Sequence, residues 1–420
     1  MPRGLFEKID YGWWIILVSF YGCLVFSGPV FFAFSLFVKP LQEQFGWSRS
    51  NIMGAFTGLY LTLAVSSPFA GKAVDRFGAK RVMALGGAIM GIGFAMLFAL
   101  KTPLHFYLGN IIVGIGASAM GPIPGTAVVS DWFRKKRGLA IGIMSMGIGV
   151  GGFVVAPLWG GVIIPVLGWR IGYLGLSILA GTTIPIALLV VKKREIATTT
   201  VPPETHRETT GKDGPVSVPN DLSLSDALKT PAFWLIAGAI LFSQFALVGT
   251  ILSQVPHLQD IGFPITTAAT ALGGIGLLSA FSKLFFGWAC DLIKSKYAFA
   301  LGVFFMAIGT FLLMVIDPGT PLFIIWAYSV TMGFGGGSWL PVISMIVSTN
   351  FGLASYGAIF GAAILIQNLG ASTGPLFAGF IYDITKGYHW AFVPFMVLYA
   401  IAIPIVLAVR QPEGRNTEIA

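Results

Sequence analysis

The sequence predicts an all-α integral membrane protein with twelve transmembrane helices in two pseudo-symmetric six-helix halves. Three observations predict this fold: the composition, the recurrence of long apolar runs, and a repeat between the two parts of the chain. Of the 420 residues, 55% are hydrophobic and 10% are charged, and the mean hydropathy is +0.83. A soluble globular chain carries about 25% charged residues, so this composition indicates an integral membrane protein. Little of the chain is left for a soluble domain.

Apolar runs long enough to cross a bilayer, about 20 residues each, recur along nearly the whole chain. They do not alternate as the strands of a membrane β-barrel do, so we expect helices. The predicted spans are 11–38, 50–70, 82–100, 104–131, 138–165, 170–191, 231–256, 266–290, 297–316, 321–349, 355–382 and 388–409. The first run is too long for a signal-peptide core and lacks an A-x-A cleavage pattern, so we expect it to be retained.

The two halves of the chain repeat each other at a steady spacing. Gly114, Gly116 and Pro122 recur at an offset of 219 residues, and four glycines between 138 and 160 recur at the same offset. A polar stretch rich in Thr, Pro and charge separates the halves. We therefore predict an N-terminal six-helix half at 1–191, a linker at 192–230 that holds one short helix at 223–229, and a C-terminal half at 231–420. Duplicated halves of this kind are typical of secondary transporters.

The distribution of positive charge predicts the orientation. Of the 26 Lys and Arg, 20 lie at the termini and in the even-numbered joints, five lie in the odd-numbered joints, and Lys283 lies inside a span. By the positive-inside rule, both termini are in the cytoplasm of a plasma membrane. The net charge of +9 is then a topogenic signal, and no nucleic-acid partner is needed to explain it.

The sequence contains no pattern typical of an enzyme. Cys23 and Cys290 lie in or beside apolar spans, which argues against a disulfide framework or a metal site. The glycine-rich stretch at Gly333 has no Lys-Ser/Thr after it, so it does not match a phosphate-binding loop. With neither a nucleophile and base pair nor a cluster of metal ligands, we expect no catalysis, no cofactor and no metal.

Lys283 is the strongest candidate for a functional residue, because it is a charged residue inside an apolar span. An ammonium in the middle of a span costs about 2.5–3.5 kcal/mol on insertion scales, so such a residue normally faces a wet cavity or the protein interior. Ser279 lies four residues earlier on the same helical face and offers a hydroxyl beside it. Lys283 either binds an anionic substrate or extends its stem to the headgroups.

The spans contain no acidic residue to neutralise this lysine. All 17 Asp and Glu fall at span ends or in joints, so a carrier of cationic drugs is disfavoured. One cation without a buried counter-ion favours a substrate with one negative charge, since the loaded site is then neutral. Further candidate substrate-binding residues at membrane depth are Gln367, Asn368, Tyr60, Tyr328, Phe32 and Phe334. Each of these also has a plain packing or hydrogen-bonding interpretation between helices.

The joint after the second span carries a recognisable motif. Gly71, Asp75, Arg76 and Gly78, followed by Lys80 and Arg81, resemble the G-x-x-x-D-R-x-G-x-K/R joint of the major facilitator superfamily. In that family the joint helps to latch the outward-open state, which implies a latch that pairs Asp75 with Arg134. The copy in the second half keeps Gly287 and Asp291 but has lost the arginine.

Further stretches narrow the resemblance. The "DYGWWI" at Asp10 and the "DWFRKKRGLAIGI" at Asp131 are similar to monocarboxylate transporters, and "SLSDALKTPAFW" before span seven resembles the oxalate:formate antiporter group. In these carriers the position four before the span-eight glycine, here Lys283, holds an arginine that binds the carboxylate. The animal carriers have an aspartate where this chain has Ser279, and the oxalate carriers a second lysine where it has Ala363.

The sequence therefore predicts a secondary active transporter of a small organic monocarboxylate, lactate- or pyruvate-like, that works by alternating access as a monomer. Proton symport and anion exchange both stay open, since a proton could reside on Lys283 or one anion could exchange for another. Alternative substrates are a dicarboxylate such as oxalate, an aromatic acid or a sulfonate. A non-transporting nutrient receptor is the alternative from another functional class.

Overall fold

The structure is a computed structural model that describes residues 11–133, 137–191, 222–352 and 355–410. Over these ranges all the regular elements are helices, as predicted. Their bounds are α1 (Tyr11–Ser27), η2 (Gly28–Phe32), α2 (Phe34–Phe45), α3 (Arg49–Phe77), α4 (Ala79–Phe98), α5 (Pro103–Met120), α6 (Pro122–Trp132), α7 (Arg137–Leu158), η3 (Trp159–Ile163), α8 (Ile164–Val190), α9 (Leu224–Lys229), α10 (Pro231–Asp260), α11 (Ile265–Leu292), α12 (Ser295–Met314), α13 (Leu322–Gly337), α14 (Trp339–Phe351), α15 (Tyr356–Thr385) and α16 (His389–Leu407).

Twelve membrane spans result from eleven long apolar helical segments. One segment, Leu139–Val190, has 52 residues and would be about 80 Å long if straight, well over twice the thickness of a hydrocarbon core. Within it, Gly168 has φ 82° and ψ 162°, a conformation that side-chain-bearing residues rarely adopt. The chain bends there, close to the predicted joint between spans five and six, and two spans result.

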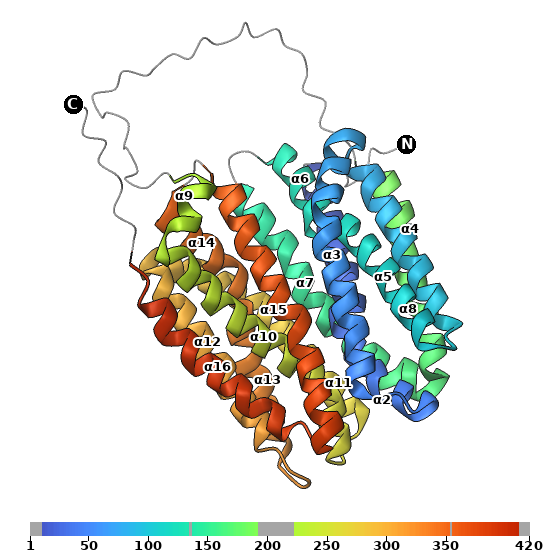
Figure 1. Ribbon diagram of the computed structural model, residues 1–420. Helices are drawn as coiled ribbons and strands as arrows, with labels where there is room; N and C mark the ends of the chain where they lie inside the picture. The colour runs from blue at the N-terminus through green and yellow to red at the C-terminus, as the bar shows by residue number, and fades with distance from the viewer. Residues whose placement is uncertain (1–10, 134–136, 192–221, 353–354, 411–420) are drawn as a thin grey trace, which may run out of the picture.

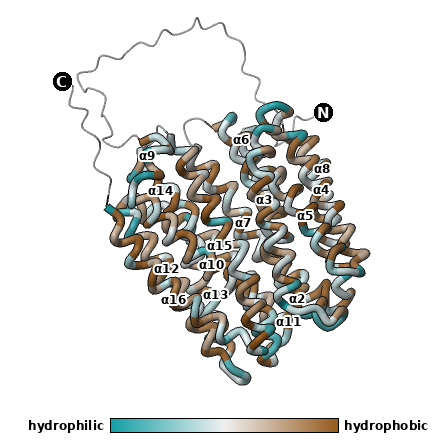
Figure 2. The backbone as a smooth tube through the Cα atoms, in the orientation of Figure 1, coloured by the Kyte–Doolittle hydropathy of each residue, from teal (hydrophilic) through white to brown (hydrophobic). Residues whose placement is uncertain are grey.

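The spans begin and end on two faces of the molecule. We call the face where α1 begins and α16 ends the terminal face. There the Tyr11 hydroxyl donates to the Val190 carbonyl at 2.7 Å, and the Lys296 ammonium donates to the Leu407 carbonyl at 3.0 Å. The opposite face holds the α2–α3, α10–α11 and α15–α16 turns. Figure 2 shows apolar residues along the helices and polar residues gathered at their ends.

The N-terminal spans lie on the right of Figure 1 in blue to green, and the C-terminal spans on the left in yellow-green to red. The fourth span of each half is interrupted: α5 and α6 meet at Gly121, and α13 and α14 meet at Ser338. The predicted short helix is confirmed as α9, with Ser223 as its N-cap. Residues 192–221 of the predicted linker lie outside the described residues, and the boundaries of the two halves stay a prediction.

The halves meet along two helix pairs, α3 with α15 and α7 with α11. Both pairs are tightly packed in the middle of the bundle and toward the opposite face. A Cβ added to Gly149 would lie 2.4 Å from the Gly276 carbonyl oxygen, and one added to Gly379 would lie 2.9 Å from the Arg49 backbone. Toward the terminal face the same four helices carry glycines with nothing within 4 Å of an added Cβ, namely Gly71, Gly142, Gly287, Gly357 and Gly361. The halves therefore splay apart at the terminal face.

Candidate functional site

A cavity of about 820 Å³ lies between the two halves. Its lining extends from the middle of the bundle to Pro68, Leu224 and Ala358, which lie toward the terminal ends of α3, α9 and α15. The walls are mostly apolar, with Phe26 and Phe31 on one side and Trp339 and several aliphatic residues on the other. A cavity of this size and character is typical of small-molecule sites.

Lys283 is the one charged side chain in the described lining of this cavity. It is 7% exposed, and its ammonium donates to the Ser279 hydroxyl at 2.8 Å and to the Ser279 carbonyl at 3.2 Å. An ammonium has three hydrogens, so one N–H remains for a ligand. The predicted pairing of Lys283 with Ser279 on one helical face is confirmed.

Close helix packing sets the direction in which Lys283 points. On one side of α11, Gly276 packs against the backbone of α7 at Gly149. On another side, a Cβ added to Gly337 of α13 would lie 2.6 Å from the Ser279 carbonyl, and the Ser282 hydroxyl donates to the Phe334 carbonyl. Lys283 lies seven residues, about two turns, after Gly276 and thus on nearly the same face of α11. Toward the terminal face α7 no longer covers this face, since Gly142 and Gly287 are open, so Lys283 is left facing the cavity.

Three amide side chains line the cavity from two helices of the C-terminal half, and two of them, Gln244 and Gln367, are buried. Gln367 of α15 is 7% exposed, and its Oε1 has no hydrogen-bond partner among the described residues. Gln244 of α10, also buried, lines the same cavity. Buried amides normally find partners, so Gln367 is a candidate contact for a bound molecule. Asn368 and Ala371 lie beside it on the wall.

The structure brings six of the eight predicted substrate-binding residues to this cavity: Lys283, Ser279, Gln367, Asn368, Tyr60 and Phe32. Two others lie elsewhere. Tyr328 is fully buried and donates to the Gln254 side-chain carbonyl, so it links α13 to α10. Phe334 packs its ring against Phe285 and Phe305, with centroids 5.0 and 4.9 Å apart. Ala363, where the oxalate carriers have a lysine, is buried outside the cavity lining.

The predicted latch on the terminal face is only partly described. Asp75 and Arg76 are exposed, Asp75 makes no ion pair with another described residue, and Gly71 faces open space. Arg134 lies outside the described residues, and the Asp291 side chain is not described. The latch therefore stays a prediction for a state in which the terminal face is closed.

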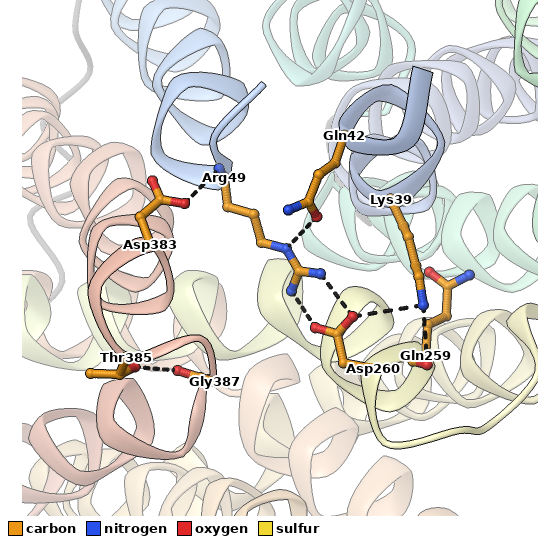
Figure 3. Close-up of polar contacts among 8 residues, drawn as sticks. All are labelled: Lys39, Gln42, Arg49, Gln259, Asp260, Asp383, Thr385 and Gly387. Carbon is orange, nitrogen blue, oxygen red and sulfur yellow. Dashed lines mark hydrogen bonds and ion pairs between the residues drawn. The ribbon is translucent and has the colours of Figure 1, made fainter. Parts of the chain in front are cut away.

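Sequence reasoning did not identify an ion-paired cluster that joins the halves on the opposite face (Figure 3). Arg49 at the start of α3 is 1% exposed, and its guanidinium contacts both carboxylate oxygens of Asp260, at 2.6 and 2.8 Å. The Lys39 ammonium lies 3.7 Å from the same carboxylate. The guanidinium also stacks on the Tyr382 ring, 3.6 Å from its centroid. We call Lys39, Arg49, Asp260 and Asp383 the opposite-face gate.

Asp383 completes the gate by capping a helix of the other half. Its two carboxylate oxygens accept from the Arg49 and Ser50 backbone N–H groups, each at 2.9 Å. These are among the first amides of α3, which have no partner within their own helix, and the positive end of the helix favours a carboxylate. The N-terminal half thus contributes two cations and the C-terminal half two carboxylates.

The family model described as Major Facilitator Superfamily matches residues 15–375 and, in a second match, 244–419. The chain belongs to this superfamily. Its members are membrane carriers and not enzymes, so the protein is a multi-pass membrane transporter that moves a small molecule across the bilayer.

Relatives of known sequence agree with this assignment. Monocarboxylate transporter 4 of Mus musculus is 26% identical over 402 residues, covering 93% of this chain and 82% of that protein. Monocarboxylate transporter 12 of Mus musculus is 22% identical over 406 residues, covering 91% and 82%. The match extends over nearly the whole of this transporter.

Solved structures share the fold at lower identity. A bacterial homolog of the human lysosomal transporter Spinster, described as inward-facing and unoccupied, superposes with a TM-score of 0.74 at 16% identity, covering 96% of this chain and 97% of that one. A D-xylose-proton symporter gives 0.72 at 16% identity, covering 97% and 99%. Both likenesses concern the fold alone.

Gln367→Leu should separate binding from folding. Because the Gln367 Oε1 has no partner to lose, we expect an unchanged or slightly higher melting temperature. If the amide contacts substrate, KM should rise about 3- to 10-fold, the value of one hydrogen bond. Thermal unfolding and uptake kinetics on the same preparation measure both.

The matched control is Gln254→Leu. This buried amide has partners, since it accepts from Tyr328 and donates to the Ala268 carbonyl at 3.1 Å. We expect it to lower the melting temperature. An unchanged KM for Gln367→Leu would remove Gln367 from the substrate site.

Proposed function

We propose that this transporter carries a small organic monocarboxylate, lactate- or pyruvate-like, by alternating access. The observation that carries the proposal is the single ammonium of Lys283 in an otherwise uncharged described lining. A monoanion neutralises that charge, so the loaded site can pass through a low-dielectric region without a net charge. The whole-length similarity to proteins named monocarboxylate transporters supports the same substrate class.

The structure corresponds, in this proposal, to the state open to the cytoplasm. We propose that both termini lie in the cytoplasm of the plasma membrane, as the positive charge distribution predicts. The terminal face is then the inner face, and the opposite-face gate closes the outer entrance. The open glycines of the terminal face and the cavity that extends toward it support this assignment. We further propose that one chain is the functional unit, since the cavity lies within a single chain.

The glycines on α7 and α11 support closure of the terminal face in the other state. These helices run antiparallel, so the residue numbers of two contacting residues add to a nearly constant value. The sum is 425 for Gly149 with Gly276 and 430 for Pro157 with Gly273. Gly142 and Gly287 add to 429. They lie seven residues, about two turns, and eleven residues, about three turns, from the first pair, and thus on the same helical faces.

Filling these open glycines should block transport without harming the state seen here. For Gly142→Leu combined with Gly287→Leu, we expect equal or higher thermal stability, because an added Cβ meets nothing within 4 Å and a helix gains up to about 1 kcal/mol on losing each glycine. Uptake should fall at least tenfold, because the terminal ends of α7 and α11 could no longer meet.

The control for this variant is Gly181→Leu. Gly181 is equally open but belongs to α8, which is not one of the four helices that join the halves. We expect it to transport normally. Normal uptake by the double variant would contradict the proposed closure.

Coupling is proposed as proton symport, with anion exchange as the second candidate. In a symporter, Lys283 is the one strongly basic group in the described lining that could carry the proton. The lack of an acidic side chain in the same lining is the observation that favours exchange. Counterflow discriminates the two. An exchanger takes up labelled lactate only against internal anion, and a symporter takes it up into empty vesicles when the outside is acidic.

The substrate class is tested by ligand-induced thermal stabilisation of the purified protein. L-lactate and pyruvate should raise the melting temperature, because a ligand that binds only the folded state stabilises it by mass action. The cation choline should have no effect, and oxalate a smaller effect than lactate. Stabilisation by choline, or by oxalate alone, would contradict a monocarboxylate site.

A further inference from the structure

A second pocket, of about 370 Å³, lies on the terminal face within the C-terminal half. It is formed where α12 begins and where α14 and α16 end, and it shares no lining residue with the central cavity. The described lining residues are Lys294, Ser295, Lys296, Ile346, Thr349, Asn350, Val406, Val409 and Arg410. Neither the transport proposal nor the predicted latch assigns these residues a function.

The charge of this pocket is one-sided. Three of its nine described lining residues are basic and none is acidic. Lys294 and Arg410 are exposed at the rim. The half-buried Lys296 ammonium donates to the Leu407 and Val409 carbonyls, each at 3.0 Å, where it caps the negative end of α16. Since an ammonium has three hydrogens, one N–H of Lys296 stays available to an acceptor in the pocket.

The start of α12 adds a second source of positive potential. Lys294 occupies the N-cap position, and no side chain caps this helix. Ser48, Thr102 and Thr230 cap α3, α5 and α10 with their hydroxyls. The first amides of α12 thus lack the usual side-chain acceptor. Buried Ser295 and Asn350 add short polar side chains to the pocket.

We propose that this pocket binds a phosphate group, namely that of an anionic phospholipid headgroup. Phosphate supplies several acceptor oxygens and negative charge to three basic side chains and an uncapped helix N-terminus. The residues beside the pocket favour lipid as the source. Leu292, Ile293 and Tyr297 are 64%, 42% and 51% exposed, and exposed apolar side chains at the end of a membrane span contact lipid. Basic pockets between membrane helices are a known form of lipid recognition.

The bound lipid would join two segments that are far apart in the sequence. Lys294 begins the connection into α12, and Arg410 follows α16, more than 100 residues later. A headgroup held between them neutralises their mutual repulsion and fixes both helix ends at the membrane surface. The consequence is a C-terminal half that is more stable in an anionic bilayer than in a neutral one, whatever substrate the central cavity carries.

The test uses the full-length purified protein and native mass spectrometry to count bound lipids. The probe is phosphatidylglycerol, with phosphatidylcholine as the neutral lipid and inorganic phosphate as the soluble source. The variant is Lys294→Gln combined with Arg410→Gln, which keeps the Lys296 contacts to α16. The control, Lys72→Gln combined with Lys229→Gln, removes two exposed charges from the same face outside the pocket.

We expect wild type and the control to retain phosphatidylglycerol in preference to phosphatidylcholine. The pocket variant should bind phosphatidylglycerol about 30-fold more weakly, because each basic residue near an anionic lipid contributes about a factor of five. Equal phosphatidylglycerol binding by the pocket variant and the control would overturn the site. Complete displacement of phosphatidylglycerol by millimolar inorganic phosphate would support a phosphate site but overturn lipid as its ligand.

Discussion

Lys283→Gln should abolish concentrative transport of a monocarboxylate while leaving the protein folded. Glutamine keeps a polar group beside Ser279 but removes the charge that faces the substrate. Loss of one partner of a desolvated charge pair typically costs about 2–4 kcal/mol, so we expect kcat/KM to fall about 30- to 1,000-fold. Initial uptake rates in liposomes, normalised to folded protein, measure the loss.

Two further variants control this result. Lys283→Arg keeps the charge, and we expect it to retain part of the activity, since a planar guanidinium binds carboxylate with two parallel hydrogen bonds. Ser279→Ala removes the 2.8 Å hydrogen bond to the ammonium and should cost only about 3- to 10-fold. Wild-type kinetics for Lys283→Gln would show that the lysine does not bind the substrate.

Asp260→Asn should open the opposite face. Arg49 is 1% exposed and has both carboxylate oxygens of Asp260 as ion-pair partners, so the substitution leaves a buried cation without its counter-ion. Breaking a buried pair costs about 3–5 kcal/mol, and we expect about 2–3 kcal/mol here because Asp260 is 25% exposed. That shifts the ratio of the two states about 30- to 150-fold toward the one open at the opposite face.

Spin-label distances on each face measure the shift. Labels at positions 101 and 317, exposed on the opposite face of the two halves, should move apart in Asp260→Asn. Labels at 72 and 229 on the terminal face should approach each other. Arg170→Gln, which removes an exposed opposite-face charge outside the gate, should change neither distance.

A double substitution tests whether the gate acts as a unit. In Arg49→Gln combined with Asp260→Asn neither charge is stranded, so the shift should be smaller than the sum of the two single shifts. Additive single and double shifts would mean that the two side chains act independently and that the ion pair does not hold the face closed.

Most of the fold could be predicted from the sequence because lipid imposes a simple rule. Each span must satisfy its own backbone hydrogen bonds and present apolar side chains, so length and composition alone predicted twelve spans and the joint near Gly168. The helix ends were less predictable. The first span was predicted to end at 38, whereas the helical segment continues to Phe45. The added turns are polar and carry Gln42, whose side-chain oxygen accepts from the Arg49 guanidinium at 2.9 Å.

The candidate site was predictable where one side chain was out of place in its surroundings. Lys283 stood out as a lone charge in an apolar run, and its neighbour Ser279 followed from helical spacing. Gln244 of α10 carried the same signal, an amide at membrane depth, but was not singled out. Tyr328 and Phe334 could not be placed, since a single polar or aromatic residue does not reveal which face of its helix meets the cavity.

The opposite-face gate shows what a single sequence hides. Arg49, Asp260 and Asp383 all lie at span ends, where charged residues are ordinary, and 334 positions separate Arg49 from Asp383. The signs of the charges at the span ends did indicate a possible pairing. Bases end span one and begin span two, and acids end spans seven and eleven, on what the topology makes the same face. Only the packing of α15 against α3 and of α10 against α15 and α2 shows that they meet.

Uptake of labelled L-lactate into liposomes that contain only this protein tests the central claim most directly. Wild type is predicted to accumulate lactate above its external concentration under an inward proton gradient, and Lys283→Gln is predicted not to. Lactate binding without flux in wild type would contradict a carrier of monocarboxylates. Equal accumulation by both proteins would contradict Lys283 as the group that holds the anion.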